Sequence, residues 1–155
     1  MGFQMIDIPA DIEPLFVAAG WRQGVRKFDS AISGLPDSLA EQIISEFGGL
    51  RVGKCGAGID LATSDVRFLI TPDPDKGGAV EEWTHVLGPL SAIADAHHEH
   101  MMIFVSAGGD YFFFTDPDEK MYLGGRSFGE AMRKLLLGLS YGPEIEPNQT
   151  MEPTR

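Results

Sequence analysis

The segment Gly48-Gly49-Leu50-Arg51-Val52-Gly53-Lys54 has the G-x-x-x-x-G-K spacing of loops that wrap phosphate groups with their backbone amides. Such a loop follows a strand and opens a helix, whose first amides complete the phosphate site. Here the leading glycines end a segment of helical periodicity, and a strand is expected at 50–52. Cys55 also stands where a Ser or Thr would bind Mg²⁺. This context argues against nucleotide binding.

A second group of potential ligands is the run His97-His98-Glu99-His100, because imidazole and carboxylate groups bind zinc. On an extended strand, His98 and His100 would share one face and His97 and Glu99 the other, so two ligands at most converge. A zinc site needs three or four ligands, and the rest of the chain holds one His and one Cys. We therefore expect these side chains to be exposed or on an edge strand, with no bound metal. Three histidines beside a carboxylate would make partner binding sensitive to pH.

The sequence supports no catalytic group. Cys55 has no histidine near it in the sequence, and the chain contains no G-x-S-x-G elbow for a nucleophilic serine. The pairs Asp73/Asp75 and Asp116/Asp118 stand beside prolines, where D-x-D usually forms a turn rather than an acid and base couple. We therefore expect neither enzymatic activity nor a cofactor.

The charge of the chain is concentrated in its middle. The 155 residues include 12 Lys and Arg against 23 Asp and Glu, a formal net charge of -11. Residues 60–119 hold twelve of these acidic residues and two of the basic ones, a net charge of -10, so the other 95 residues carry -1. Direct nucleic-acid binding is disfavoured, since it depends on clustered Lys and Arg. This asymmetry exceeds what solubility requires and favours a positively charged partner.

The termini and the cysteine content indicate a cytoplasmic protein. Residues 1–15 contain three acidic residues and no Lys or Arg, unlike a signal peptide. No run approaches the roughly 18 apolar residues of a membrane-spanning helix. The single Cys55 cannot form an internal disulfide, which suits a reducing compartment.

The pattern of apolar residues predicts one α+β domain over residues 1–141. Helical spacing and start or stop signals predict helices at 15–19, 39–47, 79–85 and 127–138. Alternation and short apolar runs predict strands at 50–52, 66–70, 87–96, 101–106, 111–115 and 120–123. Short connections favour antiparallel neighbours, so we expect a mixed, mostly antiparallel central sheet packed with N-terminal, middle and C-terminal helices. Residues 142–155 are proline-rich and are expected to form a flexible tail.

The central strands are apolar at successive positions rather than at alternate ones. Phe112 and Phe114 are as apolar as Tyr111 and Phe113, so both faces of the sheet require cover. One interpretation is a sheet with helices on both sides. The other is a partly exposed aromatic surface that receives a partner.

Several short motifs occur in an order and spacing that resemble those of a known family. They are the helix-ending Ala19-Gly20-Trp21, the run Ile43-Ile44-Ser45-Glu46-Phe47-Gly48-Gly49-Leu50, Trp83 with Leu87-Gly88, and Gly125-Arg126-Ser127-Phe128-Gly129-Glu130-Ala131 leading into Leu135-Leu136-Leu137-Gly138. Over about residues 12–139 the chain resembles the SUKH superfamily of immunity proteins, and within it the third subgroup.

This resemblance implies a non-catalytic α+β domain that binds and neutralises a toxin. In the family the toxin is often a nuclease, delivered by neighbouring bacterial cells or encoded beside the immunity protein. The family's Glu-Phe-Gly-Gly-Leu pattern ends a helix and turns into a strand, which accounts for Gly48 and Gly49 without a phosphate. Other members resemble general protein-interaction domains, so a module acting on cellular proteins is an alternative. A small metal-binding or nucleotide-binding enzyme is a third.

The leading hypothesis is an acidic inhibitor that occludes a basic toxin domain of nuclease type. Its candidate charged contacts lie in predicted loops or beside the short helix: Asp73, Asp75, Glu81, Glu82, Asp116, Asp118 and Glu119. Phe112 and Phe114 are candidate aromatic anchors, provided that they are exposed. We expect a monomer or weak homodimer that contacts no membrane. Mimicry of nucleic acid would require the acidic residues of 60–119 to share one face.

Overall fold

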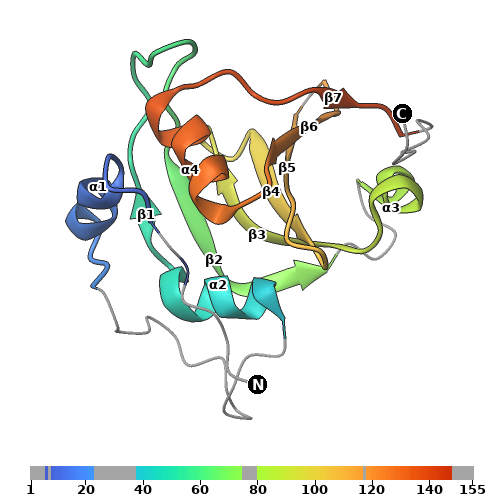
Figure 1. The fold of residues 1–155 in the computed structure, drawn as a ribbon, viewed down its shortest axis with the longest axis horizontal. Coiled ribbons are helices and arrows are strands. Elements are labelled where there is room, and N and C mark those ends of the chain that lie inside the picture. The colour runs from blue at the N-terminus through green and yellow to red at the C-terminus, as the bar shows by residue number, and fades with distance from the viewer. Residues whose placement is uncertain (1–5, 7, 23–37, 75–79, 117, 148–155) are drawn as a thin grey trace.

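A single antiparallel sheet forms the centre of the molecule (Figure 1). The computed structural model describes residues 6, 8–22, 38–74, 80–116 and 118–147. Seven strands follow one another in the sheet in chain order. They are β1 (Arg51–Val52), β2 (Val66–Pro74), β3 (Leu90–Ala96), β4 (Met101–Ser106), β5 (Tyr111–Thr115), β6 (Lys120–Gly125) and β7 (Glu144–Ile145). The predicted α+β class and the antiparallel pairing are confirmed.

Helices cover both faces of this sheet. The helices α1 (Glu13–Ala18), α2 (Leu39–Phe47) and α4 (Phe128–Leu137) gather on one side, and α3 (Glu81–Leu87) lies apart from them (Figure 1). Under the first three helices, Phe16, Phe47, Phe68 and Phe128 pack ring against ring. Under α3, Trp83 contacts Phe114 edge to face with 5.6 Å between ring centroids. The sheet therefore separates two apolar cores, one on each of its faces.

The alternation along β5 sends aromatic rings into both cores. Tyr111 and Phe113 face α2 and α4, while Phe112 and Phe114 face α3. Phe112 is 4% exposed and Phe114 5% exposed, so neither offers an anchor to a partner. The proposed aromatic docking surface is wrong, because α3 and β7 already fill the space over these rings.

Strand β2 is longer than predicted. The sequence predicts a strand that ends at residue 70 and a turn at the prolines beside Asp73, yet Asp73 pairs with Ala92 and Pro74 with Ser91 after a register shift. The strand tolerates these prolines because β1 pairs only with Arg67 and Val66, which leaves the later part of β2 at the sheet edge.

The chain after Tyr141 also departs from the predicted tail. Glu144 and Ile145 form β7, which pairs with β6, and Ile145 is buried in the core under α3. The indole Nε1 of Trp83 donates to the Ile145 carbonyl oxygen at 2.6 Å. The buried Ile145 side chain, the pairing with β6 and the hydrogen bond from Trp83 thus hold a segment that composition alone marks as unstructured. Residues 148–155 lie outside the described part.

Candidate partner-binding surface

Two turns with exposed carboxylates lie side by side at one end of the sheet. The turn at residues 97–100 connects β3 to β4, and Asp116, Asp118 and Glu119 lie in the turn between β5 and β6. The backbone N–H of Asp116 donates to the His100 carbonyl oxygen at 2.9 Å and joins them. The exposed acidic residues of this acidic turn pair are Glu99, Asp116, Asp118 and Glu119.

Each turn is held by its own backbone and side-chain contacts. The Thr115 hydroxyl donates to the Asp118 carboxylate at 2.5 Å, which fixes the second turn from inside. Glu99 is 69% exposed and lies 3.8 Å from the Arg67 guanidinium, so the carboxylate stays at the surface. Lys120 follows the second turn as an exposed base. The two turns therefore carry exposed carboxylates, and the basic residues Arg67 and Lys120 lie next to them in the neighbouring strands.

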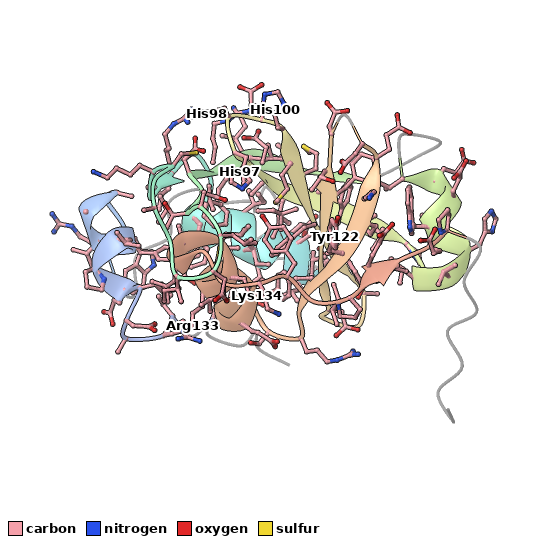
Figure 2. All side chains as sticks on the ribbon, turned by 90° about the horizontal axis from the view of Figure 1, so that it is seen from above. His97, His98, His100, Tyr122, Arg133 and Lys134 are labelled. Carbon is pink, nitrogen blue, oxygen red and sulfur yellow. The ribbon has the colours of Figure 1, made fainter. Side chains whose placement is uncertain are left out.

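The run of histidines forms the turn between β3 and β4 and is not an extended strand. The backbone φ values of His97, His98 and Glu99 are 52°, 53° and 74°. They lie in the left-handed region, which residues other than glycine rarely adopt. This backbone turns His97 inward while His98 and His100 project from the rim of the molecule (Figure 2). The strand-based grouping of His98 with His100 is therefore wrong in its geometry, although both are exposed as predicted.

His97 takes part in the packing beneath the turn. Its Nε2 lies 2.9 Å from the Ser64 hydroxyl and 3.4 Å from the Tyr141 hydroxyl. Burial lowers the pKa of His97 below its ordinary value, although the Asp65 carboxylate opposes the shift. Burial also raises the pKa of Tyr141. The neutral forms of both groups therefore hold this end of the sheet to the segment that precedes β7.

A buried carboxylate links three parts of the chain at the same end. Asp65 is 6% exposed; its Oδ2 accepts from the Arg51 guanidinium at 2.9 Å, and its Oδ1 accepts from the His98 backbone N–H at 3.1 Å and the Cys55 thiol at 3.4 Å. Burial raises the pKa of Asp65, but the hydrogen bonds from His98 and Cys55 outweigh it, so its pKa lies below the ordinary value. Local spacing gave no sign of this cluster.

A second acidic surface lies beside α3. A cleft of about 480 Å³ is lined by Glu81, Glu82, His85, Glu146 and Pro147. Both predicted carboxylates of α3 are exposed on it. Glu146 is not among the predicted contacts, because the proline-rich composition places it in the expected tail, whereas β7 brings it against α3. We call this the α3 cleft.

The chain matches the family described as SUKH-3 immunity protein over residues 8–138. It is a member of the SUKH-3 immunity protein family. No curated protein and no solved structure gave a significant match. The family supports an immunity role and implies a protein toxin as the partner of this SUKH-3 chain.

The SUKH-3 chain does not bring all the predicted contact residues together. Asp73 lies within β2, at the opposite end of the sheet from the acidic turn pair, and Asp75 is outside the described residues. Glu81 and Glu82 line the α3 cleft, and Asp116, Asp118 and Glu119 belong to the acidic turn pair. The candidate residues therefore lie on separate surfaces. Successive strands run in opposite directions, so the connections between them lie alternately at the two ends of the sheet.

Several of the acidic residues between positions 60 and 119 have internal roles in the SUKH-3 fold. Asp95 pairs with Arg67 on the neighbouring strand, and Asp110 lies 3.3 Å from Arg126. Asp60 accepts hydrogen bonds from the backbone N–H and the hydroxyl of Ser140. The acidic residues of this range whose side chains the structure describes thus do not form one continuous face. Of the described helices, none has the length and hydropathy to cross a membrane.

Proposed function

We propose that this chain is a cytoplasmic, non-catalytic immunity protein that binds a basic toxin domain of nuclease type and blocks its active site or substrate path. The observation that carries this proposal is the acidic turn pair, where one backbone hydrogen bond sets Glu99 beside Asp116, Asp118 and Glu119. Membership of the SUKH-3 immunity family supplies the class of partner.

The charge of such a partner follows from its chemistry. A nuclease holds its substrate through Lys and Arg side chains that contact phosphate groups, so its substrate path is basic. Carboxylates on two adjacent turns would be attracted to that path and would speed the encounter through long-range steering. The α3 cleft would offer further carboxylates, those of Glu81, Glu82 and Glu146, to basic residues outside the path.

The proposal is tested by measuring association between the purified chain and a toxin domain encoded beside its gene. We expect tight binding, loss of the toxin's nuclease activity, and an association rate that falls steeply as salt rises. An association rate that is the same at low and high salt would contradict electrostatic inhibition. Inhibition of a toxin that is not basic would keep the immunity role and overturn the nuclease assignment.

A pair of variants separates local charge from total charge. Asp116→Asn with Glu119→Gln raises the net charge by two at the acidic turn pair, and Glu13→Lys raises it by two on α1. We expect the double variant to slow association about tenfold or more and the α1 variant to leave it nearly unchanged. Equal effects of the two changes would show that only the total charge matters.

A further inference from the structure

Three side chains of the types that bind zinc converge beside the turn at 97–100. They are Cys55, Asp65 and His98, and their ligand atoms all lie within 4.8 Å of one another. The Cys55 Sγ is 3.4 Å from the Asp65 Oδ1, and the His98 Nδ1 is 3.8 Å from the Asp65 Oδ2. Neighbouring ligands of a tetrahedral zinc ion are roughly 3.3–3.5 Å apart, given its bond lengths. The separations of Cys55 and His98 from the Asp65 carboxylate are thus close to this spacing, and all three ligand atoms lie within 4.8 Å of one another.

We propose that Cys55, Asp65 and His98 form a zinc-binding site with a fourth position open to water or to a partner's side chain. This inference is independent of toxin binding. It also revises the expectation that no metal is bound, which rested on at most two ligands converging from the histidine run and on one His and one Cys elsewhere in the chain.

The loop that carries Cys55 is held in place by the end of α4. The backbone N–H groups of Ile59 and Asp60 donate to the carbonyl oxygens of Leu137 and Gly138 at 3.0 and 2.7 Å. These carbonyls have no partner within the helix, so the loop satisfies the end of α4 while the helix fixes the loop. The Thr63 hydroxyl also donates to the Lys54 carbonyl oxygen at 2.7 Å, directly beside Cys55. Cys55 therefore lies on a loop whose position is fixed by these hydrogen bonds.

The carboxylate of Asp65 is oriented before any metal arrives. Arg51 holds one oxygen and the His98 backbone N–H holds the other, so both oxygens are fixed in direction. Outer contacts of this kind orient metal ligands and increase affinity. Zinc would replace the thiol proton of Cys55, which passes to solvent, and the thiolate and carboxylate would then balance the charge of the ion. Arg51 remains paired with the carboxylate.

The mixture of donors favours zinc over the hard cations. Calcium and magnesium prefer oxygen ligands alone, whereas thiolate, imidazole and carboxylate together suit zinc. Cys55 and His98 are exposed, and Figure 2 shows His98 projecting at the rim, so the ion reaches the site without opening the core. Binding would clamp the loop at 53–65 to the first turn of the acidic turn pair.

The test uses the full chain, stripped of metal with a chelator, and two independent measurements. Titration with Zn²⁺ against a chromophoric competitor should give one ion per chain. Substitution with Co²⁺ should give the visible bands of tetrahedral cobalt and a thiolate-to-cobalt charge-transfer band. Because it needs no variant, the cobalt spectrum of the unmodified chain decides the matter even where a substitution perturbs folding. Absence of the charge-transfer band overturns the proposal.

Variants identify the ligands. Cys55→Ser and His98→Ala should each weaken zinc binding about tenfold or more, and Cys55→Ser should abolish the charge-transfer band. The matched control is His85→Ala, which removes an exposed imidazole from α3 and should leave affinity unchanged. Equal affinity in the control and in His98→Ala would overturn the assigned ligand set. Circular dichroism establishes that each variant keeps its fold.

Discussion

The backbone N–H of Asp116 donates to the carbonyl oxygen of His100 at 2.9 Å and joins two turns that belong to different hairpins. The contact lies beyond the last paired residues of β4 and β5, Met101 and Thr115, so it extends the sheet's hydrogen bonding into the turns. This backbone contact therefore adds to the pairing of β4 with β5 in setting the spacing of the exposed carboxylates.

Asp116→Pro removes the donor of that contact, and we expect the free energy of unfolding to fall by about 1 kcal/mol or more. Urea denaturation measures the change. Asp116→Ala is the matched control, because it removes the same carboxylate and retains the backbone N–H. A control that loses as much stability as the proline variant would assign the effect to the side chain.

Trp83→Phe is expected to lower the free energy of unfolding by about 1–3 kcal/mol. The change retains an aromatic ring against Phe114 but leaves the buried Ile145 carbonyl oxygen without its indole donor.

Removal of the residues after Gly142 should also destabilise the protein, since it deletes the buried Ile145. A truncated chain as stable as the full one would restore the flexible-tail interpretation.

Gly138→Ala is expected to destabilise the fold by about 1 kcal/mol or more. Gly138 ends α4 with a φ of 73°, and an added Cβ would lie 2.2 Å from the Leu61 carbonyl oxygen. Thermal unfolding measures the loss. Gly108→Ala serves as the control, because the nearest atom to its Cβ would be 3.9 Å away, and its effect should stay within about 0.5 kcal/mol.

The start of α4 should make stability depend on pH. Glu130 accepts the Arg126 backbone N–H at 3.0 Å, which holds its pKa below the ordinary 4.5 against the opposing effect of burial, and Lys134 assists. A lowered pKa in the folded state stabilises the protein above the unfolded value, and this contribution is lost as the pH falls through the folded value. Glu130→Gln should therefore weaken the loss of stability on acidification, measured by urea denaturation at several pH values.

Ser127→Ala separates capping from titration at the same helix. Its hydroxyl accepts from the Glu130 backbone N–H at 3.1 Å and does not titrate in the acid range. We expect a loss of about 1 kcal/mol that is similar at neutral and acidic pH. A loss confined to one end of the pH range would contradict the separate roles of the two side chains.

The sequence was sufficient for the elements that depend on local chemistry. The predicted helices at 39–47 and 127–138 are present, with Ser38 and Ser127 as their N-caps, and short connections produced antiparallel neighbours. The apolar run of β5 also identified a sheet buried on both faces. It did not reveal that α3 and β7 leave no aromatic ring exposed, because that depends on which segments cover the second face.

The candidate sites divide in the same way. Residue type and turn signals are local properties, and they were sufficient to predict exposed positions for Asp116, Asp118, Glu119, His98 and His100. They did not select Glu99 or Glu146 as contacts. The pairing of Asp116 with His100, the position of Glu146 against α3, and the approach of Cys55 to His98 arise only in the folded chain. Antiparallel pairing, and the hydrogen bonds between the loop at 53–65 and the end of α4, bring these groups together although they are far apart in the sequence. The local pattern of residues cannot predict such long-range contacts.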